Sequence, residues 1–219
     1  MAHSLLHANN KHVNDAVVAE SLKGILSAKS LDCLHRRQWL SDEVVNAYMR
    51  LLQNKFPHVY AFNSFFWQKL STNGTKYDFN GVSNWTRKKK IDIFSYDLVL
   101  IPLHVHNSHW ALGAVDIKSK SIEYLDSRRD PPPENFFQYV KKYLKDELSG
   151  NTQDDIQSPR WIKIQYDNLP EQLNDNDCGL FMCLYATYLA AGMSAELVTR
   201  EELTVMRQRM LVLFCKGEL

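Results

Sequence analysis

Apolar residues recur at helical spacing in several stretches of the chain. Between positions 41 and 53 they stand three and four residues apart, which predicts a helix with one buried face. The same spacing predicts a helix over 14–26. Residues 179–191 are apolar almost throughout and predict a nearly uninterrupted apolar helix. Further helices are expected in 63–70, 134–148 and 201–215.

Other segments have the pattern of β-strands. The short apolar run 98–103 predicts a buried strand, and 109–117 and 121–126 predict a hairpin. Residues 161–167 alternate enough for one more strand. Together these elements predict a small mixed sheet flanked by helices, which is an α+β architecture.

The composition fits one globular domain. A chain of 219 residues with 45% hydrophobic content can bury one sizeable core, so we expect a single domain over 1–219, with residues 1–10 loosely ordered. The 26 Lys and Arg residues against 25 Asp and Glu residues leave a formal charge of +1. This charge is too small for a surface that follows phosphates, so no nucleic-acid partner is expected. We expect the chain to be a monomer.

Cysteine usage and hydropathy favour an intracellular protein. The four cysteines have neither the spacing of metal ligands nor the density of a disulfide-rich domain, which suits a reducing compartment. Met1–Asn10 lacks the basic start and apolar core of a signal peptide. No run of about 20 apolar residues predicts a membrane span.

Cys178 stands where a polar turn meets the apolar helix. The first turn of a helix presents unpaired amides and the positive end of the dipole, which favour a thiolate, the reactive form of cysteine. Gly179 is expected to leave open space for a substrate backbone. The alternative is a buried core cysteine, an interpretation that suits Cys183. Cys178 is a candidate nucleophile only if a base and a carboxylate accompany it.

His109 and Asp126 can supply that base and carboxylate. His109 opens the first strand of the predicted hairpin and Asp126 closes the second. Because the start of one antiparallel strand lies beside the end of the next, the two side chains are expected to meet at one edge of the sheet. A carboxylate bonded to one ring nitrogen fixes the tautomer and leaves the other nitrogen to accept a thiol proton. Taken singly, His109 could be a hydrogen-bonded strand end and Asp126 part of a turn.

Three histidines in six residues, His104, His106 and His109, raise the possibility of a metal site. At the end of a strand their side chains would splay apart, and no Cys pair or acidic motif completes a tetrahedral set. We therefore expect neither a metal ion nor another cofactor.

Several short motifs occur in order between about Leu31 and Phe214, and the most specific is Gln172, six positions before Cys178. The others are 39–43 (WLSDE), 61–66 (AFNSFF), 84–90 (NWTRKKK), 108–112 (SHWAL), 124–127 (YLDS) and 177–179 (DCG). With these motifs the chain resembles the Ulp1/SENP family of cysteine proteases, which process SUMO and related ubiquitin-like proteins.

The resemblance implies a papain-like fold of the Ulp1 type and a role for each candidate residue. Cys178 is the nucleophile, His109 the general base and Asp126 the residue that orients the base. Gln172 is a donor in the oxyanion hole. Removing one such donor typically costs about 3 to 4 kcal/mol of transition-state stabilisation.

The resemblance also implies a substrate site. Trp39 and Trp110 are expected to form the walls of a narrow channel for a Gly-Gly tail, since flat indoles can close over a backbone without side chains. Asp42 would anchor groups that line this channel, or simply cap the helix that begins there. Trp85 and Phe65 are similar to family residues near the tail or the ubiquitin-like body. For each aromatic residue the alternative is ordinary core packing.

Two basic clusters, Arg36-Arg37 and the run 87–90, have three open interpretations. Such clusters are usually solvated faces. They can also dock an acidic face of SUMO, in which case Arg37 contacts the substrate, or act as a nuclear import signal.

We therefore predict a cysteine peptidase that cleaves after the C-terminal Gly-Gly of SUMO. It would mature SUMO precursors and release SUMO from lysines, with SUMO and SUMO-conjugated proteins as partners, in the nucleus or at the nuclear envelope. Three alternatives remain: a protease for NEDD8 or ubiquitin, an acyltransferase of the same structural clan, and an inactive SUMO-binding module.

Overall fold

A computed structural model describes residues 18–35, 38–149 and 160–219. These residues form a five-stranded sheet with the spatial order β1-β2-β3-β4-β5. The inner strands β2, β3 and β4 pair antiparallel, whereas β1 and β5 join the two edges in parallel. The strands are β1 (Val59–Ala61), β2 (Leu98–Val105), β3 (His109–Asp116), β4 (Ser121–Leu125) and β5 (Ile162–Gln165).

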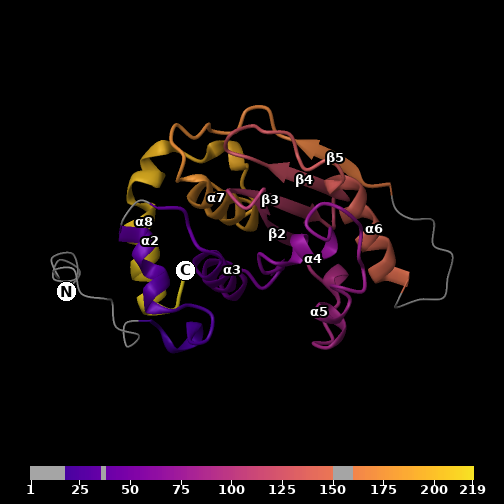
Figure 1. The fold of residues 1–219 in the computed structure, drawn as a ribbon, viewed down its shortest axis with the longest axis horizontal. Coiled ribbons are helices and arrows are strands. Elements are labelled where there is room, and N and C mark those ends of the chain that lie inside the picture. Colours follow the sequence, from indigo (N-terminus) through magenta and orange to yellow (C-terminus); the bar gives the residue numbers. More distant parts are fainter. Residues whose placement is uncertain (1–17, 36–37, 150–159) are drawn as a thin grey trace.

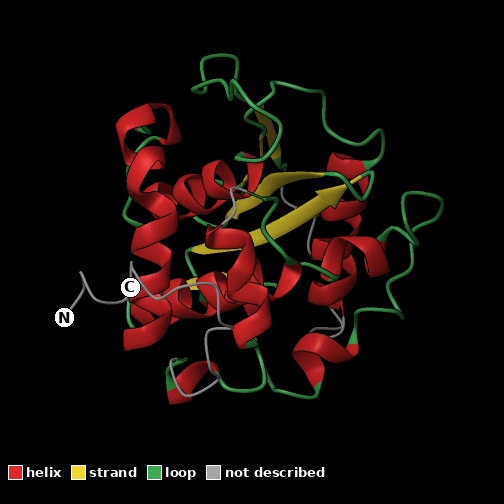
Figure 2. Cartoon of the chain, turned by 60° about the vertical axis from the view of Figure 1, so that its left-hand side comes forward, coloured by secondary structure: helices red, strands yellow, loops and turns green. Residues whose placement is uncertain are grey.

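Helices cover both faces of the sheet (Figure 1, Figure 2). On one face lie α2 (Asp32–His35), α3 (Asp42–Lys55), α7 (Cys178–Ala190) and α8 (Arg200–Lys216). On the other lie α4 (Phe66–Leu70), α5 (Asn84–Arg87) and α6 (Phe136–Ser149). Short helical turns occur at η2 (Glu20–Leu22), η3 (Ala28–Leu31), η4 (Ile93–Ser95) and η5 (Ala195–Leu197). Among the described residues, no helix is both long and apolar enough to cross a membrane.

The central strand β3 separates two hydrophobic cores. Trp110, Leu112 and Ala114 point into the core formed with α3, α7 and α8. Ala111 and Val115 point into the core formed with α4 and α6. Because successive side chains of a strand alternate between faces, a strand buried on both sides must be apolar throughout, as β3 is between its two polar ends. His109 is the first residue of this strand, so the packing that holds β3 also holds His109.

Most of the predicted elements are confirmed. The helix expected over 41–53 is α3, and Ser41 is its cap, because the Ser41 Oγ accepts a hydrogen bond from the Val44 N–H at 3.3 Å. Asp42 is the first helical residue and is not the cap. The hairpin of β3 and β4 and the apolar helix α7, with Cys178 in its first turn, are also as expected.

Some segments differ from the prediction. The helix expected over 14–26 is wrong in its described part, where only η2 is helical and Gly24 has a φ of 79°. That left-handed conformation is incompatible with a continuing helix; residues 14–17 lie outside the described residues. The helix expected over 63–70 is confined to α4, while β1 and α5 were not predicted because three or four residues are too few to show a period.

Candidate active site

His109 and Asp126 meet at the edge of the β3–β4 hairpin. His109 is the first residue of β3 and Asp126 directly follows β4. The Nε2 of His109 lies 2.9 Å from each carboxylate oxygen of Asp126. Both side chains are buried, so the predicted juxtaposition is present and shielded from water.

Two further groups hold the Asp126 carboxylate. The Tyr124 hydroxyl donates to Oδ2 at 3.0 Å, and the Arg128 N–H donates to Oδ1 at 2.7 Å. Burial and the neighbouring Asp126 raise the pKa of Tyr124 above its ordinary range, so its phenol keeps its proton and remains a donor. Tyr124 belongs to the motif at 124–127, but nothing in the sequence pattern indicated this role.

The imidazole of His109 is protonated more readily than an ordinary histidine. Burial alone would lower its pKa, but the hydrogen bond to Asp126, followed by the interaction with Cys178, outweighs burial and raises the pKa to about 9. The second ring nitrogen, Nδ1, is buried and makes no hydrogen bond to an N or O atom of the described residues. Since Nε2 is bonded to Asp126, Nδ1 is the atom left to exchange a proton with the thiol.

The turn before α7 positions Cys178, whose side chain interacts with the His109 imidazole. The Oδ1 of Asn174 accepts hydrogen bonds from the N–H groups of Asn176 and Asp177, both at 3.0 Å, and its Nδ2 donates to the Asp177 carboxylate at 2.7 Å. As the first residue of the helix, Cys178 has an amide without an intrahelical acceptor. Cys183, one and a half turns further on, is fully buried in the core, as expected.

Gln172 lies in the same loop and is attached to the end of β4. Its N–H donates to the Ser127 carbonyl at 2.8 Å, and its Oε1 accepts from the Ser127 hydroxyl at 2.7 Å. Its Nε2 donates to the Asn174 carbonyl. The candidate oxyanion donor is therefore fixed to both the hairpin with Asp126 and the turn with Cys178.

Trp39 and Trp110 are both bonded near the nucleophile. The Trp39 Nε1 donates to the carbonyl of Asp175, three residues before Cys178, and the indole is 46% exposed. The Trp110 Nε1 donates to the Leu40 carbonyl at 2.9 Å, and that indole is buried. Trp39 thus lies against the loop that precedes Cys178. Trp110 is buried beneath the segment that carries Trp39.

Gly179 has a different role from the one expected. A Cβ at this position would lie 2.9 Å from the Leu40 Cγ and 3.0 Å from the Leu40 Cβ. The space beside Gly179 is therefore filled by Leu40 and is not open to a substrate, so that expectation is wrong. The absence of a side chain instead lets the segment with Trp39 pack directly on α7.

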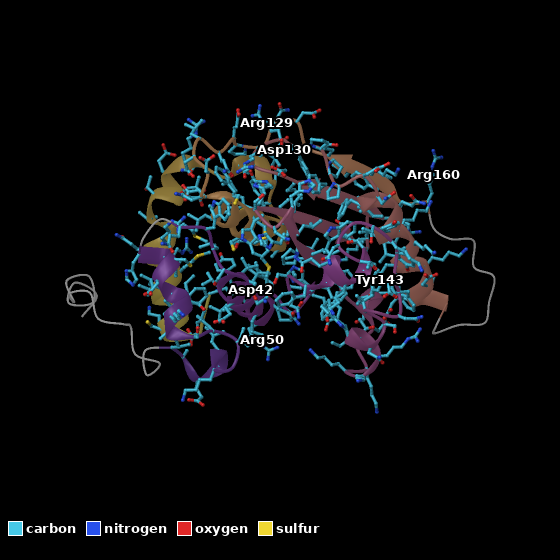
Figure 3. The ribbon with its side chains drawn as sticks, in the orientation of Figure 1. Asp42, Arg50, Arg129, Asp130, Tyr143 and Arg160 are labelled. Carbon is cyan, nitrogen blue, oxygen red and sulfur yellow. The ribbon has the colours of Figure 1, made fainter. Side chains whose placement is uncertain are left out.

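Two adjoining hollows lead away from the tryptophans. The smaller, about 310 Å³, is lined by Trp39, Trp110, Asp42 and Phe65, among others. The larger, about 820 Å³, shares Asp42 and Phe65 with it and extends to Trp85 on α5. Asp42 and Arg50 of α3, labelled in Figure 3, both belong to the larger one. Five of the six predicted substrate residues thus line one surface, while Arg37 lies outside the described residues.

Arg207 of α8 is a structural part of the site that sequence analysis missed. Its buried guanidinium donates to the carbonyls of Cys33, Gln38 and Asn176 and to the Asp177 carboxylate, at 2.9 to 3.0 Å. It therefore joins the segment before Trp39 to the turn before Cys178. An arginine in the predicted helix 201–215 carries no sequence signal for such a role.

A possible metal-ligand group coincides with the candidate base. In the described ranges the only cluster of this kind is His109, Asp126 and Asp130, whose potential ligand atoms lie within 4.8 Å of one another. His104 and His106 do not take part. Because Nε2 of His109 is already bonded to Asp126, a cation would have to replace that proton, and we assign no metal.

The raised pKa of His109 predicts a pH-dependent contribution to stability. Since the folded-state pKa of about 9 exceeds the ordinary value of 6.5, this contribution is fully present below pH 6.5 and is lost as the pH rises through about 9. The advantage of the wild type over Asp126→Asn in urea unfolding should therefore shrink between these two pH values. Asp97→Asn, which removes an exposed carboxylate, should show no such change. An NMR titration that gives His109 a pKa at or below 6.5 would contradict this account.

The contact between Gly179 and Leu40 predicts a coupled effect on stability. Gly179→Ala should lower the free energy of unfolding by about 1–3 kcal/mol, because the added methyl must displace Leu40. Leu40→Ala removes the contacting Cγ and Cδ1 and leaves only the Cβ, so adding Gly179→Ala to it should cost less than Gly179→Ala costs in the wild type. Additive losses in a double-mutant cycle measured by urea unfolding would show that the two residues do not compete for this space.

Comparison with known proteins identifies one family. A model of the Ulp1 protease family, C-terminal catalytic domain, matches residues 38–214. Putative ubiquitin-like-specific protease 1B of Arabidopsis thaliana is 34% identical over 180 residues, which are 78% of this chain and 52% of that protein. Sentrin-specific protease 2 of Homo sapiens is 30% identical over 203 residues, which are 90% of this chain and 33% of that protein. The chain thus spans about a third to a half of these relatives.

A solved structure has the same fold. The C-terminal Ulp1 protease domain in complex with Smt3, the yeast ortholog of SUMO, aligns with a TM-score of 0.73 and 26% identity over 96% of this chain and 98% of that one. The predicted papain-like α+β fold is therefore confirmed. Every candidate residue from Trp39 to Cys178 falls within the matched range, and the chain belongs to the Ulp1 protease family.

Proposed function

We propose that this chain is a cysteine peptidase that cleaves after the Gly-Gly tail of SUMO, both in SUMO precursors and in SUMO joined to lysine. The observation that carries the proposal is the buried pair of His109 and Asp126, whose free ring nitrogen is left for Cys178. The similarity to sentrin-specific and ubiquitin-like-specific proteases supports the choice of substrate.

The proposed reaction is nucleophilic catalysis by Cys178. Its sulfur, as the thiolate, attacks the carbonyl carbon of the terminal glycine, and the negative charge moves to the carbonyl oxygen. The Gln172 amide and the Cys178 N–H donate to that oxygen. His109, protonated, gives its proton to the leaving amine as the C–N bond breaks. Water, deprotonated by His109, then hydrolyses the thioester and restores the thiolate.

Asp126 acts through His109 in this mechanism. With its carboxylate bonded to Nε2, the imidazole can carry its proton on Nδ1 without leaving a buried charge unpaired. Tyr124 and Arg128 hold the carboxylate in position for that role.

The hollow beside the tryptophans suits a tail without side chains. Trp39 and Trp110 line it, and Trp39 is bonded to the loop that leads to Cys178. An extended Gly-Gly segment presents only backbone to such flat rings. Residues with a Cβ would meet the indoles. Gly-Gly selectivity would therefore come from exclusion more than from specific hydrogen bonds.

The larger hollow suits the folded body of the ubiquitin-like protein. It is continuous with the smaller one through Asp42 and Phe65, and it carries Lys88 and Lys89 from the basic run on one side. Contacts made here, away from the reacting bond, would supply most of the selectivity.

We propose that residues 1–219 form one protease domain that acts as a monomer without nucleic acid, in the nucleus or at the nuclear envelope. Relatives named as sentrin-specific and ubiquitin-like-specific proteases support a location near SUMO conjugates.

The proposed activity predicts selective reaction with SUMO tail probes. Wild-type protein should release a fluorogenic group from the SUMO C-terminus and form an adduct with SUMO-vinyl sulfone, whereas Cys178→Ser should lose the activity. Cys215→Ser, which alters another free cysteine, should retain it. A SUMO tail with alanine in place of the penultimate glycine should react poorly, because its Cβ meets the tryptophans.

Other outcomes of the same panel would contradict the proposal. Preferential reaction with ubiquitin or NEDD8 probes would assign another substrate, and transfer of an acetyl group without hydrolysis would assign an acyltransferase. Binding of SUMO without turnover or labelling would indicate a binding module. Full activity in Cys178→Ser would reject the nucleophile.

The basic residues at the larger hollow predict a charge effect on substrate binding. Lys88→Glu and Lys89→Glu should each raise KM severalfold with little change in kcat, and should weaken its dependence on salt. Lys141→Glu, the same charge change on the outer side of α6, should leave KM unchanged. Equal effects of all three variants would indicate that 87–90 is only a solvated face.

A further inference from the structure

We propose that Ser127 is a positioning residue for the oxyanion hole, acting through the side chain of Gln172. The inference rests on the proposed function, because it concerns the donor that would stabilise the negative charge formed by attack of Cys178. Ser127 belongs to the matching motif at 124–127, but its hydrogen bonds go to Gln172 and it has no part in the proton transfers.

Ser127 and Gln172 are joined twice. The Ser127 carbonyl accepts the Gln172 N–H at 2.8 Å, and the Ser127 hydroxyl donates to Gln172 Oε1 at 2.7 Å. Both side chains are buried, with Ser127 1% and Gln172 8% exposed. Side chains 45 positions apart are thereby locked together where water cannot replace the bond.

Asn174 and Ser127 together hold the Gln172 amide with its nitrogen available to the substrate. A backbone carbonyl can only accept, so the Asn174 carbonyl must face the Gln172 nitrogen. The Gln172 oxygen is then directed to Ser127, whose hydroxyl donates to it. Because an amide nitrogen carries two hydrogens, one is used by Asn174 and the other remains for an oxyanion.

The opposite orientation would oppose catalysis. If the amide rotated by half a turn, its oxygen would face the Asn174 carbonyl and the developing oxyanion, and both contacts would be repulsive. The Asn174 carbonyl therefore selects the orientation in which Gln172 donates, and the Ser127 hydroxyl holds the oxygen end of the amide in that orientation. Its neighbours Arg129 and Asp130, labelled in Figure 3, continue the same loop at the molecular surface, where the Arg129 guanidinium donates to the Leu169 carbonyl.

The test compares Ser127→Ala with Gln172→Ala in turnover of a fluorogenic SUMO conjugate. Removing the oxyanion donor should lower kcat by about 10² to 10³-fold. Ser127→Ala should lower kcat by roughly tenfold, since the donor is present but no longer held, with KM nearly unchanged. In the double variant, loss of Ser127 should add nothing to the effect of Gln172→Ala.

Ser121→Ala is the matched control. Ser121 is a buried serine at the other end of β4, and its hydroxyl donates to a Glu123 carboxylate oxygen at 2.7 Å. Its replacement should lower stability by a similar amount and leave kcat unchanged. If Ser127→Ala does not fold, Ser127→Cys, which keeps the size but is a weak donor, provides the same comparison.

The outcomes separate this inference from the proposed function. Failure of the wild type to turn over any SUMO substrate would reject the function; slowing by Gln172→Ala but not by Ser127→Ala would reject only the positioning role. An additive loss in the double variant would also reject it.

A measurement that needs no turnover completes the test. The two Nε2 hydrogens of Gln172 should give separate, slowly exchanging NMR signals in the wild type and faster exchange in Ser127→Ala. Unchanged exchange would overturn the inference.

Discussion

The hydrogen bond between the His109 imidazole and the Asp126 carboxylate constrains the rest of the site. Both groups are buried at the end of a hairpin whose strands are covered on both faces, so water cannot replace either group as a partner if the other is removed. Tyr124 and Arg128 complete the bonding of the carboxylate. The pair is therefore stable in one arrangement only, with Nδ1 of the ring left over. Nδ1 is therefore the atom that can exchange a proton with the Cys178 thiol.

The nucleophile reaches this pair through contacts between segments that are distant in the sequence. Leu40 fills the space beside Gly179, and the Trp110 indole donates to the Leu40 carbonyl. The packing of Leu40 on Gly179 therefore positions both Trp39, the residue before it, and the start of α7. The Arg207 guanidinium also donates hydrogen bonds to the turn before Cys178. The hydrophobic core and the active site therefore share residues, and changes in packing at the start of α7 should affect chemistry as well as stability.

How much the sequence could predict depends on how local each signal is. The α3 helix and the β3–β4 hairpin follow from periodicity alone, and the meeting of His109 with Asp126 follows from the geometry of that hairpin. The same rule failed near Gly24, where apolar spacing is not accompanied by helical backbone. The attachment of Ser127 to Gln172 could not be predicted, because periodicity carries no information on which loops meet. The expectation of open space beside Gly179 rested on the residue type alone, and it failed because the sequence does not show that Leu40 packs there.

The most direct test of the account is the rate at which Cys178 is labelled by SUMO-vinyl sulfone in the wild type and in Asp126→Asn. The substitution is nearly isosteric and leaves the sulfur, the tryptophans and Gln172 in place. If the carboxylate orients the base, labelling should slow by on the order of 10²-fold or more while the protein remains folded. Equal labelling rates in two folded proteins would contradict the central role of the His109–Asp126 pair.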